Sequence, residues 1–188
     1  MTRLTRIASM VGLLALTTLT LPAMAAAEER KCRGKIGART VDNVRVPPGA
    51  TCVLKRTHVK GTVEVERGAV LKARRVRVIG NVQGENARRV NVVRRSRVGG
   101  SVQVKQGRAA AVRRSRVNGD IQYEENRGRL AAVRNRVGGN IQVFQNTGGV
   151  RIRGNRVVGN LQCKENRPRP VGGRNRVQGS KEDQCARL

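Results

Sequence analysis

Apolar and polar residues alternate along most of the chain, and the alternation returns in the same phase about every twenty residues. A glycine marks each return, at spacings of 19 or 20 residues: Gly61, Gly80, Gly100, Gly119, Gly139, Gly159 and Gly179. Two residues before each glycine lies a valine: Val59, Val78, Val98, Val117, Val137, Val157 and Val177. Two residues after it lies an apolar residue in six units: Val63, Val82, Val102, Ile121, Ile141 and Leu161. Such alternation predicts one strand per unit with a single buried face.

A second, weaker alternation falls midway through each unit, at Val90 and Val92, Ala109 and Ala111, Leu130 and Ala132, and Val150 and Ile152. No stretch has the 3.6-residue period of a helix. A unit this short cannot bury its own apolar face, so successive units must stack. We therefore predict an all-β fold: a single parallel β-helix (β-solenoid) of about seven coils of 19–20 residues. Connection rules favour a right-handed one.

Two columns of amides accompany the repeat. Asn126, Asn146 and Asn166 each follow a repeat glycine by seven residues, which predicts left-handed turn residues that stack as an amide ladder. The residue three after each glycine is Gln or Glu in every unit, which predicts an outward amide column bonded along the stack.

The ends of the chain differ from the repeats. Residues 1–25 combine Arg3 and Arg6, a short apolar run and the small-residue site Ala23-Met24-Ala25, which predicts a secretory signal peptide. Residues 26–52 are then an N-terminal cap segment, 53–180 the solenoid and 181–188 a C-terminal hook. No other segment is apolar enough to cross a membrane. We expect a secreted or periplasmic protein.

All four cysteines follow the predicted signal peptide, at Cys32, Cys52, Cys163 and Cys185. An even number of cysteines in an exported chain indicates two disulfides, for which three connectivities exist. The spacing suggests Cys32–Cys52 and Cys163–Cys185, one pair stapling each end. A metal site is disfavoured because no Cys-x-x-Cys occurs and His58 is the only histidine.

Charge adds a second periodic feature. The chain holds 40 Lys and Arg against 12 Asp and Glu, a formal net charge of +28, with no Trp, one Tyr and one Phe. Arginines occupy the position three before the repeat glycine, after His58 in the first unit: Arg77, Arg97, Arg116, Arg136, Arg156 and Arg176. They also occupy the position five before it, with Gly154 as the exception: Arg56, Arg75, Arg95, Arg114, Arg134 and Arg174. Parity with the inward valines places both columns outside.

Two interpretations of these columns remain open. One is a solvated basic face with mobile counterions. The other is a docking stripe for an extended polyanion, because the arginine fork binds carboxylate, phosphate or sulfate at two points. Acidic polysaccharide, envelope phosphates and extracellular nucleic acid are the candidate partners. Sequence-specific reading of nucleic acid is disfavoured because stacking aromatics are missing.

Candidate catalytic residues are scarce. Parallel β-helices include polysaccharide lyases and hydrolases, so such an enzyme is the alternative function. The densest acidic group is Asp120, Glu124 and Glu125, with Glu165 two coils on, and no pair of acids is placed to flank a cleft. We expect the acids to be scattered partners of the arginine columns. The chain is therefore predicted to have no catalytic residues, no cofactor and no metal.

Units of the form Arg-x-Arg-Val-x-Gly-Asn-Ile/Leu-Gln, together with residues 159–166 and 181–185, resemble secreted bacterial parallel β-helix repeat proteins of unassigned function. The resemblance covers about residues 50–185 and implies the architecture without an activity. A looser resemblance is to bactofilin-type polymer-forming solenoids, whose open end coils join end to end. The predicted disulfide caps depart from that bactofilin pattern, and the heavy arginine loading departs from both groups.

Overall fold

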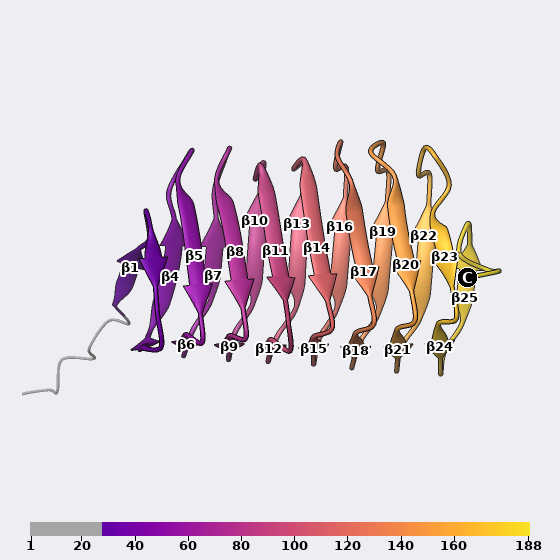
Figure 1. Cartoon of the computed structure of the whole chain (residues 1–188). Coiled ribbons are helices and arrows are strands. Elements are labelled where there is room, and N and C mark those ends of the chain that lie inside the picture. Colours follow the sequence, from indigo (N-terminus) through magenta and orange to yellow (C-terminus); the bar gives the residue numbers. More distant parts are fainter. Residues whose placement is uncertain (1–27) are drawn as a thin grey trace, which may run out of the picture.

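The computed structural model describes residues 28–188, so the predicted signal peptide lies outside the described residues. These residues wind through three parallel sheets, here called A, B and C, in which each strand pairs with the strand three elements later in the chain (Figure 1). The seven glycine-marked units are successive turns, and no helix occurs in the described chain. The predicted parallel β-solenoid is confirmed.

The strands are short, and each sheet takes one from every turn. Sheet A contains β1 Glu29–Lys31, β4 Asn43–Val46, β7 Val63–Val65, β10 Val82–Glu85, β13 Val102–Lys105, β16 Ile121–Glu124, β19 Ile141–Phe144, β22 Leu161–Lys164 and β25 Lys181–Asp183. Sheet B contains β2 Lys35–Ile36, β5 Thr51–Lys55, β8 Val70–Arg74, β11 Arg89–Val93, β14 Ala109–Arg113, β17 Leu130–Val133, β20 Val150–Arg153 and β23 Val171–Gly173. Sheet C contains β3 Thr40–Val41, β6 His58–Val59, β9 Arg77–Val78, β12 Arg97–Val98, β15 Arg116–Val117, β18 Arg136–Val137, β21 Arg156–Val157 and β24 Arg176–Val177.

Like residues stack on like. In sheet A, Val102 lies between Val82 and Ile121, and in sheet C, Val98 pairs with Val117. The inward side chains form one continuous core of mostly Val, Leu, Ile and Ala. No helix long and apolar enough to span a membrane is found within residues 28–188.

One predicted register is wrong. Ala110 and Val112 face the core in β14, whereas Ala109 and Ala111 face outward, because Ala110 pairs with Val90 and Val112 with Val92. Residues 109–111 are all alanine, so apolar and polar residues do not alternate there. The sequence pattern therefore could not show which of these alanines face the core.

The segments outside the predicted repeats extend the same sheets. Residues 29–46 of the predicted cap segment supply β1 to β4, and residues 181–183 of the predicted hook form β25. Both suggested disulfides are present, Cys32–Cys52 with a sequence separation of 20 and Cys163–Cys185 with 22. By the chain-entropy account, closing a loop of this length stabilises the folded state by about 3 kcal/mol.

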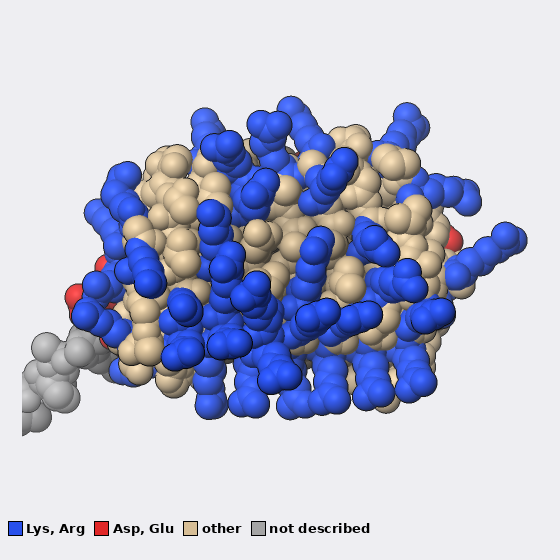
Figure 2. All heavy atoms as spheres, viewed as in Figure 1, with Lys and Arg blue, Asp and Glu red and all other residues tan. Residues whose placement is uncertain are grey.

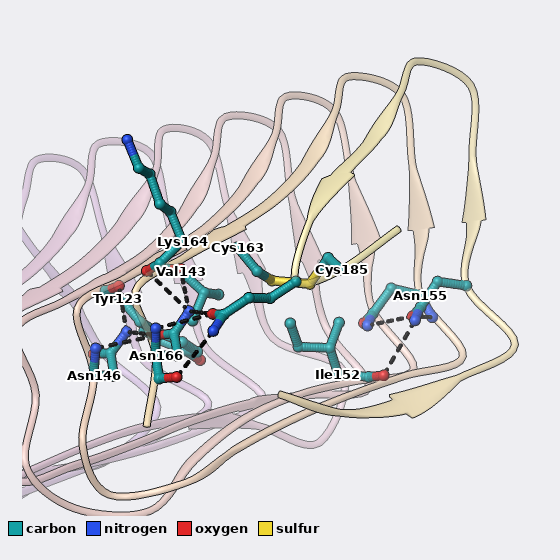
Figure 3. The surroundings of a disulfide bond; sticks show 11 residues. Tyr123, Val143, Asn146, Ile152, Asn155, Cys163, Lys164, Asn166 and Cys185 are labelled. Atoms are coloured by element: carbon teal, nitrogen blue, oxygen red, sulfur yellow. Dashed lines mark hydrogen bonds between the residues drawn. A yellow bond between two sulfur atoms is a disulfide. The ribbon is translucent and has the colours of Figure 1, made fainter. Parts of the chain in front are cut away.

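The asparagine ladder exists, but its residues are not the left-handed turn residues that we predicted. Asn126, Asn146 and Asn166 are buried, and the positive φ belongs to the residue before each, for example 54° at Glu125. Each Asn side chain bonds to the next coil, and Gln184 closes the column beside the Cys163–Cys185 disulfide (Figure 3). The buried asparagine amides form hydrogen bonds with backbone N–H and C=O groups that the turn leaves without partners in the sheets.

The outward amide column is confirmed on sheet A. Gln83, Gln103, Gln122, Gln142 and Gln162 each donate an Nε2 hydrogen bond to the next member, and Gln162 donates to Glu182. This column keeps the outer face of sheet A polar without using charge along its middle.

Close packing between coils explains the repeat glycines. At six of the seven, an added Cβ would overlap the side chain of the Asn, Thr, Ser or Asp that follows the previous repeat glycine, as Gly139 would overlap Asp120. At Gly61, the first of them, it would overlap the side chain of Asn43. None of these seven glycines has a positive φ, so space and not backbone freedom selects them. That polar side chain bonds a backbone N–H of the next coil, for example Asp120 Oδ1 with Asn140 N at 2.6 Å.

We predict that Gly139→Ala lowers the free energy of unfolding by about 1–3 kcal/mol, because the new methyl group must displace Asp120 from its bond to Asn140. Gly37→Ala is the matched control, since an added Cβ there meets nothing within 4 Å. Urea unfolding of the two variants checks the prediction, which fails if both have the same midpoint.

Tyr123, the single tyrosine, is fully buried and donates a hydrogen bond to the Ala131 carbonyl at 2.9 Å. Burial raises the pKa of its phenol well above the usual value, because the phenolate would lose its hydration. The stability that this shift contributes is complete below about pH 10, the unfolded pKa, and is lost as the pH rises further.

We therefore expect tyrosinate absorbance to appear only as the protein unfolds in alkali, in step with loss of the circular dichroism of the strands. Free N-acetyltyrosinamide, titrated alongside, should ionise near pH 10. Ionisation of Tyr123 near pH 10 with the circular dichroism unchanged would contradict this buried placement.

Candidate anion-binding surface

The six arginines three before the repeat glycines lie on the outer face of sheet C. Adjacent members pair in register, as Arg97 does with Arg77 and with Arg116, and all six are exposed. In a parallel stack their backbones are about 4.8 Å apart. Figure 2 shows a row of Lys and Arg along the edge where Figure 1 labels β6 to β24. His58 precedes Arg77 in this column and is half-buried.

The six arginines five before the glycines lie in the connection from sheet B to sheet C, and they are also exposed. All six have a positive φ, and so does the glycine in the remaining turn: 58° at Arg56, 54° at Arg75, 64° at Arg95, 49° at Arg114, 55° at Arg134, 57° at Arg174 and 67° at Gly154. We call these six residues, together with the six of sheet C, the arginine stripe; it has twelve members.

All seven turns thus place a left-handed residue at this corner, arginine in six of them and glycine in one. The corner from sheet A to sheet B also has a left-handed residue in most turns, but there the residues vary: Gly49, Gly68, Asn86, Gln106, Glu125, Gln145 and Glu165. Glycine and asparagine suit this conformation best, and other side chains cost about 1 kcal/mol or more. The backbone therefore does not explain why arginine recurs at only one of the two corners.

The acidic residues lie away from the stripe, so our expectation that they partner the arginine columns is wrong. None of the twelve Asp and Glu residues lies on sheet B, on sheet C or in the connection between these two sheets. They lie on sheet A and in the turns beside it. Figure 2, which looks onto sheet B, shows acidic atoms only towards the two ends of the rod. The sequence conceals this segregation because each turn visits all three sheets.

Ion pairs follow the same division. Within residues 28–188 they use the cations Arg45, Lys60, Lys105 and Lys164, and no stripe guanidinium forms an ion pair or a side-chain hydrogen bond. Arg45 on sheet A shows the contrast, since its hydrogen bond to Glu66, and the charges of Glu66 and Glu29, raise the pKa of its guanidinium. Neighbouring stripe charges repel by about 1 kcal/mol in water at this spacing, and salt screens that repulsion.

The candidate acidic cluster is dispersed by the fold. Asp120 lies in the turn from sheet C to sheet A and bonds Asn140, whereas Glu124 pairs with Lys105 on the outer face of sheet A. Glu125 and Glu165 accept hydrogen bonds from Gln106 and Gln145. No group of three or more His, Cys, Asp or Glu placed to hold a metal ion occurs in the described chain.

A second set of buried asparagines, which the sequence analysis did not identify, forms hydrogen bonds with the backbone beneath the stripe. Asn135 and Asn175 lie between the two stripe arginines of their turns, and Asn155 lies between Gly154 and Arg156. Each of the three donates a hydrogen bond to a sheet B carbonyl at 2.8–3.1 Å. They also bond one another from coil to coil. The stripe backbone is thus held by a polar ladder, and the Arg-Asn-Arg motif was the signal for it.

Two depressions border the stripe. One, of about 710 Å³, lies on sheet C and is lined by Arg116, Arg136, Arg156, Arg176 and Lys181. The other, of about 750 Å³, lies where sheet B meets sheet C and adds arginines that the sequence interpretation did not select: Arg74, Arg94, Arg113, Arg151 and Arg153. No acidic residue lines either depression.

Comparison of the chain with protein-family models, with curated proteins and with solved structures found no match.

Proposed function

We propose that this protein is an exported, non-catalytic rod that binds an extended polyanion along the arginine stripe. The observation that carries the proposal is that the twelve stripe arginines share one side of the rod and have no anionic partner there. Arginine guanidiniums bind carboxylate, sulfate and phosphate oxygens in two-point contacts, and a row of them matches a linear polymer.

The arginine stripe destabilises the folded protein, which supports a functional role for the stripe. Six stripe arginines occupy a left-handed conformation that glycine adopts more easily, and Gly154 shows that the fold accepts glycine there. The repulsion along both columns adds to this cost. Strain of this kind tends to accompany function, and an anionic ligand would relieve the repulsion.

Export is part of the proposal. The two disulfides suit an oxidising compartment outside the cytoplasm, and the predicted signal peptide would deliver the chain there. Envelope phosphates, acidic polysaccharide and extracellular nucleic acid are the polyanions that the protein would meet. Contacts to nucleic acid would be to its backbone and would not depend on its sequence.

The acidic residues support a non-catalytic role, because Asp120, Glu124, Glu125 and Glu165 are engaged in ladders and pairs and do not converge on one place. A polysaccharide lyase would release unsaturated products that absorb ultraviolet light. Incubation with pectate or alginate and Ca²⁺ should therefore give no increase in absorbance, and an increase would overturn this part of the proposal.

Chromatography of the disulfide-bonded protein on immobilised heparin and on immobilised polyphosphate tests binding. We expect retention at about 0.15 M salt on both and release at higher salt, because binding releases counterions. Elution from both columns at lower salt, together with generally basic proteins used as standards, would overturn the proposal.

A further inference from the structure

The outer face of sheet B has a pattern that the stripe lacks. Along the middle of the sheet lie Asn91, Ala111 and Ala131, adjacent in register, with Lys72 and Arg151 at the two ends of this column. The middle of the sheet is therefore an uncharged floor of small side chains. In Figure 2, uncharged atoms are visible between the blue side chains on this face.

Cations flank the floor on alternating sides. β11 has Arg89 at its start and Val93 at its end, whereas β14 has Ala109 at its start and Arg113 at its end. The paired positions make this a true alternation, since Arg89 pairs with Ala109 and Val93 with Arg113.

The alternation continues in both directions. Arg74 ends β8, Arg129 directly precedes β17, which ends at Val133, and Arg153 ends β20. At the paired strand positions, five successive coils thus have an arginine at the end, start, end, start and end. Arg94, one residue past β11, lies outside this register and lines the depression at the corner with sheet C. The two edges of the floor are about 13 Å apart, four residues along a strand, and successive coils are about 4.8 Å apart.

Two shallow depressions occupy this floor and its edge. One of about 270 Å³ is lined by Arg89, Ala111, Arg113, Arg129 and Ala131, among others. It shares Val93 and Arg113 with the depression of about 750 Å³ at the corner with sheet C. Both are free of acidic residues. We call the floor with its five flanking arginines the zigzag trough.

We infer that the zigzag trough binds an acidic polysaccharide with a flat two-fold ribbon, such as a β-1,4-linked uronan. In such a ribbon each sugar is turned over relative to the last, so successive carboxylates project from opposite edges. One sugar per coil would bring each carboxylate to the side on which that coil has its arginine. The C–H faces of the rings would lie on the Ala and Val positions, which offer apolar contact.

This inference rests on the proposed function and specifies which class of polyanion the protein binds. Polyphosphate has no apolar face, so the floor would add nothing to its binding. Nucleic acid bases would call for aromatic stacking partners, and the trough has none among its residues.

Oligomannuronate and oligoguluronate of equal length are the probes. They carry the same charge per sugar and differ in the configuration at one carbon, which makes mannuronate a flat ribbon and guluronate a buckled chain. We expect the protein to bind oligomannuronate about tenfold more tightly at the same salt concentration, as measured by calorimetry. Equal affinities, or tighter binding of oligoguluronate, would overturn the inference.

A triple variant, Arg89→Gln, Arg113→Gln and Arg129→Gln, should remove this preference and leave most of the polyphosphate binding. The three side chains are exposed, so the fold should tolerate the changes. Arg33→Gln, Arg167→Gln and Arg187→Gln, also exposed, remove the same charge elsewhere and should keep the preference.

The outcomes separate the two proposals. A preference that survives the triple variant overturns the trough and leaves polyanion binding by the stripe intact. If the protein binds polyphosphate but has equal affinity for the two uronates, the trough is likewise overturned and polyanion binding by the stripe is kept. Failure to bind polyphosphate and both uronates overturns the proposed function, and the trough with it.

Discussion

Replacing Arg75, Arg114, Arg134 and Arg174 together by glycine will make the protein more stable and a weaker binder of polyanions. Each arginine has a φ near +50°, where glycine avoids steric strain, and each removal also lessens repulsion along the column. Part of this gain in stability is lost because glycine raises the conformational entropy of the unfolded chain. We expect a net gain of about 0.5 kcal/mol per site in the free energy of unfolding.

Binding should change in the opposite direction. With B-DNA as the probe, each lost phosphate contact lowers the slope of log affinity against log salt by about 0.9, so four contacts lower it by about 3.6. Affinity near 0.1 M salt should fall by about a hundredfold or more. Thermal unfolding and salt-dependent binding titrations measure the two effects.

Gln106→Gly and Gln145→Gly are the matched control, because these glutamines have φ values of 54° and 56° at the other left-handed corner. The control should gain stability and bind as the parent protein does. If the four arginine replacements leave affinity unchanged, the stripe is only a solvated face. If they destabilise the protein, the arginines stabilise the corner in a way that the structure does not show.

Asn146→Ala should have the largest effect on stability. Asn146 Nδ2 donates to the Tyr123 carbonyl at 2.9 Å and to Asn166 Oδ1 at 2.9 Å. Its Oδ1 accepts hydrogen bonds from the backbone and the side chain of Asn126. Alanine would leave the buried Asn126 N–H without its partner, at about 1–3 kcal/mol. It would also remove one hydrogen bond each from Asn126 Nδ2, Asn166 Oδ1 and the Tyr123 carbonyl, at about 1 kcal/mol each.

The expected loss of about 4 kcal/mol or more is a large part of the stability of an ordinary domain, which is about 5–15 kcal/mol. Urea unfolding followed by circular dichroism measures it. The neighbouring Thr147 is exposed, and Thr147→Ala should change stability by less than about 0.5 kcal/mol. Similar unfolding midpoints for the two variants would contradict the role assigned to the asparagine ladder.

The fold was predictable because one regularity recurs at a fixed phase. The glycines and the valines two residues before them predict stacked coils, and Val98 does pair with Val117. The corners were less predictable. Asn126 is a residue type common in turns, yet it is buried, and Glu125 before it takes the left-handed conformation. Which of two adjacent corner residues turns inward depends on contacts between coils, and alternation within one strand carries no information on them.

The candidate site was predictable only in part. The stripe arginines keep a constant offset from the repeat glycines, so parity placed them outside, and all are exposed. The trough arginines share no single offset, because Arg74, Arg113 and Arg153 lie six residues before a repeat glycine and Arg89 and Arg129 lie eleven and ten before one. Arg89 and Arg129 recur in every second unit, and Arg74, Arg113 and Arg153 recur in the alternate units. A search at the period of one coil overlooks a pattern that repeats over two.

The most direct test of the central claim compares two variants of equal net charge. One replaces the six sheet C arginines of the stripe by glutamine: Arg77, Arg97, Arg116, Arg136, Arg156 and Arg176. The other replaces six exposed cations outside the stripe and the trough by glutamine: Arg33, Arg67, Arg108, Arg127, Arg167 and Arg187. The measurement is the affinity for polyphosphate at about 0.15 M salt. We predict that the first variant loses most of its affinity and that the second stays within a few-fold of the parent. Equal losses would show that total charge, and not the arginine stripe, determines binding.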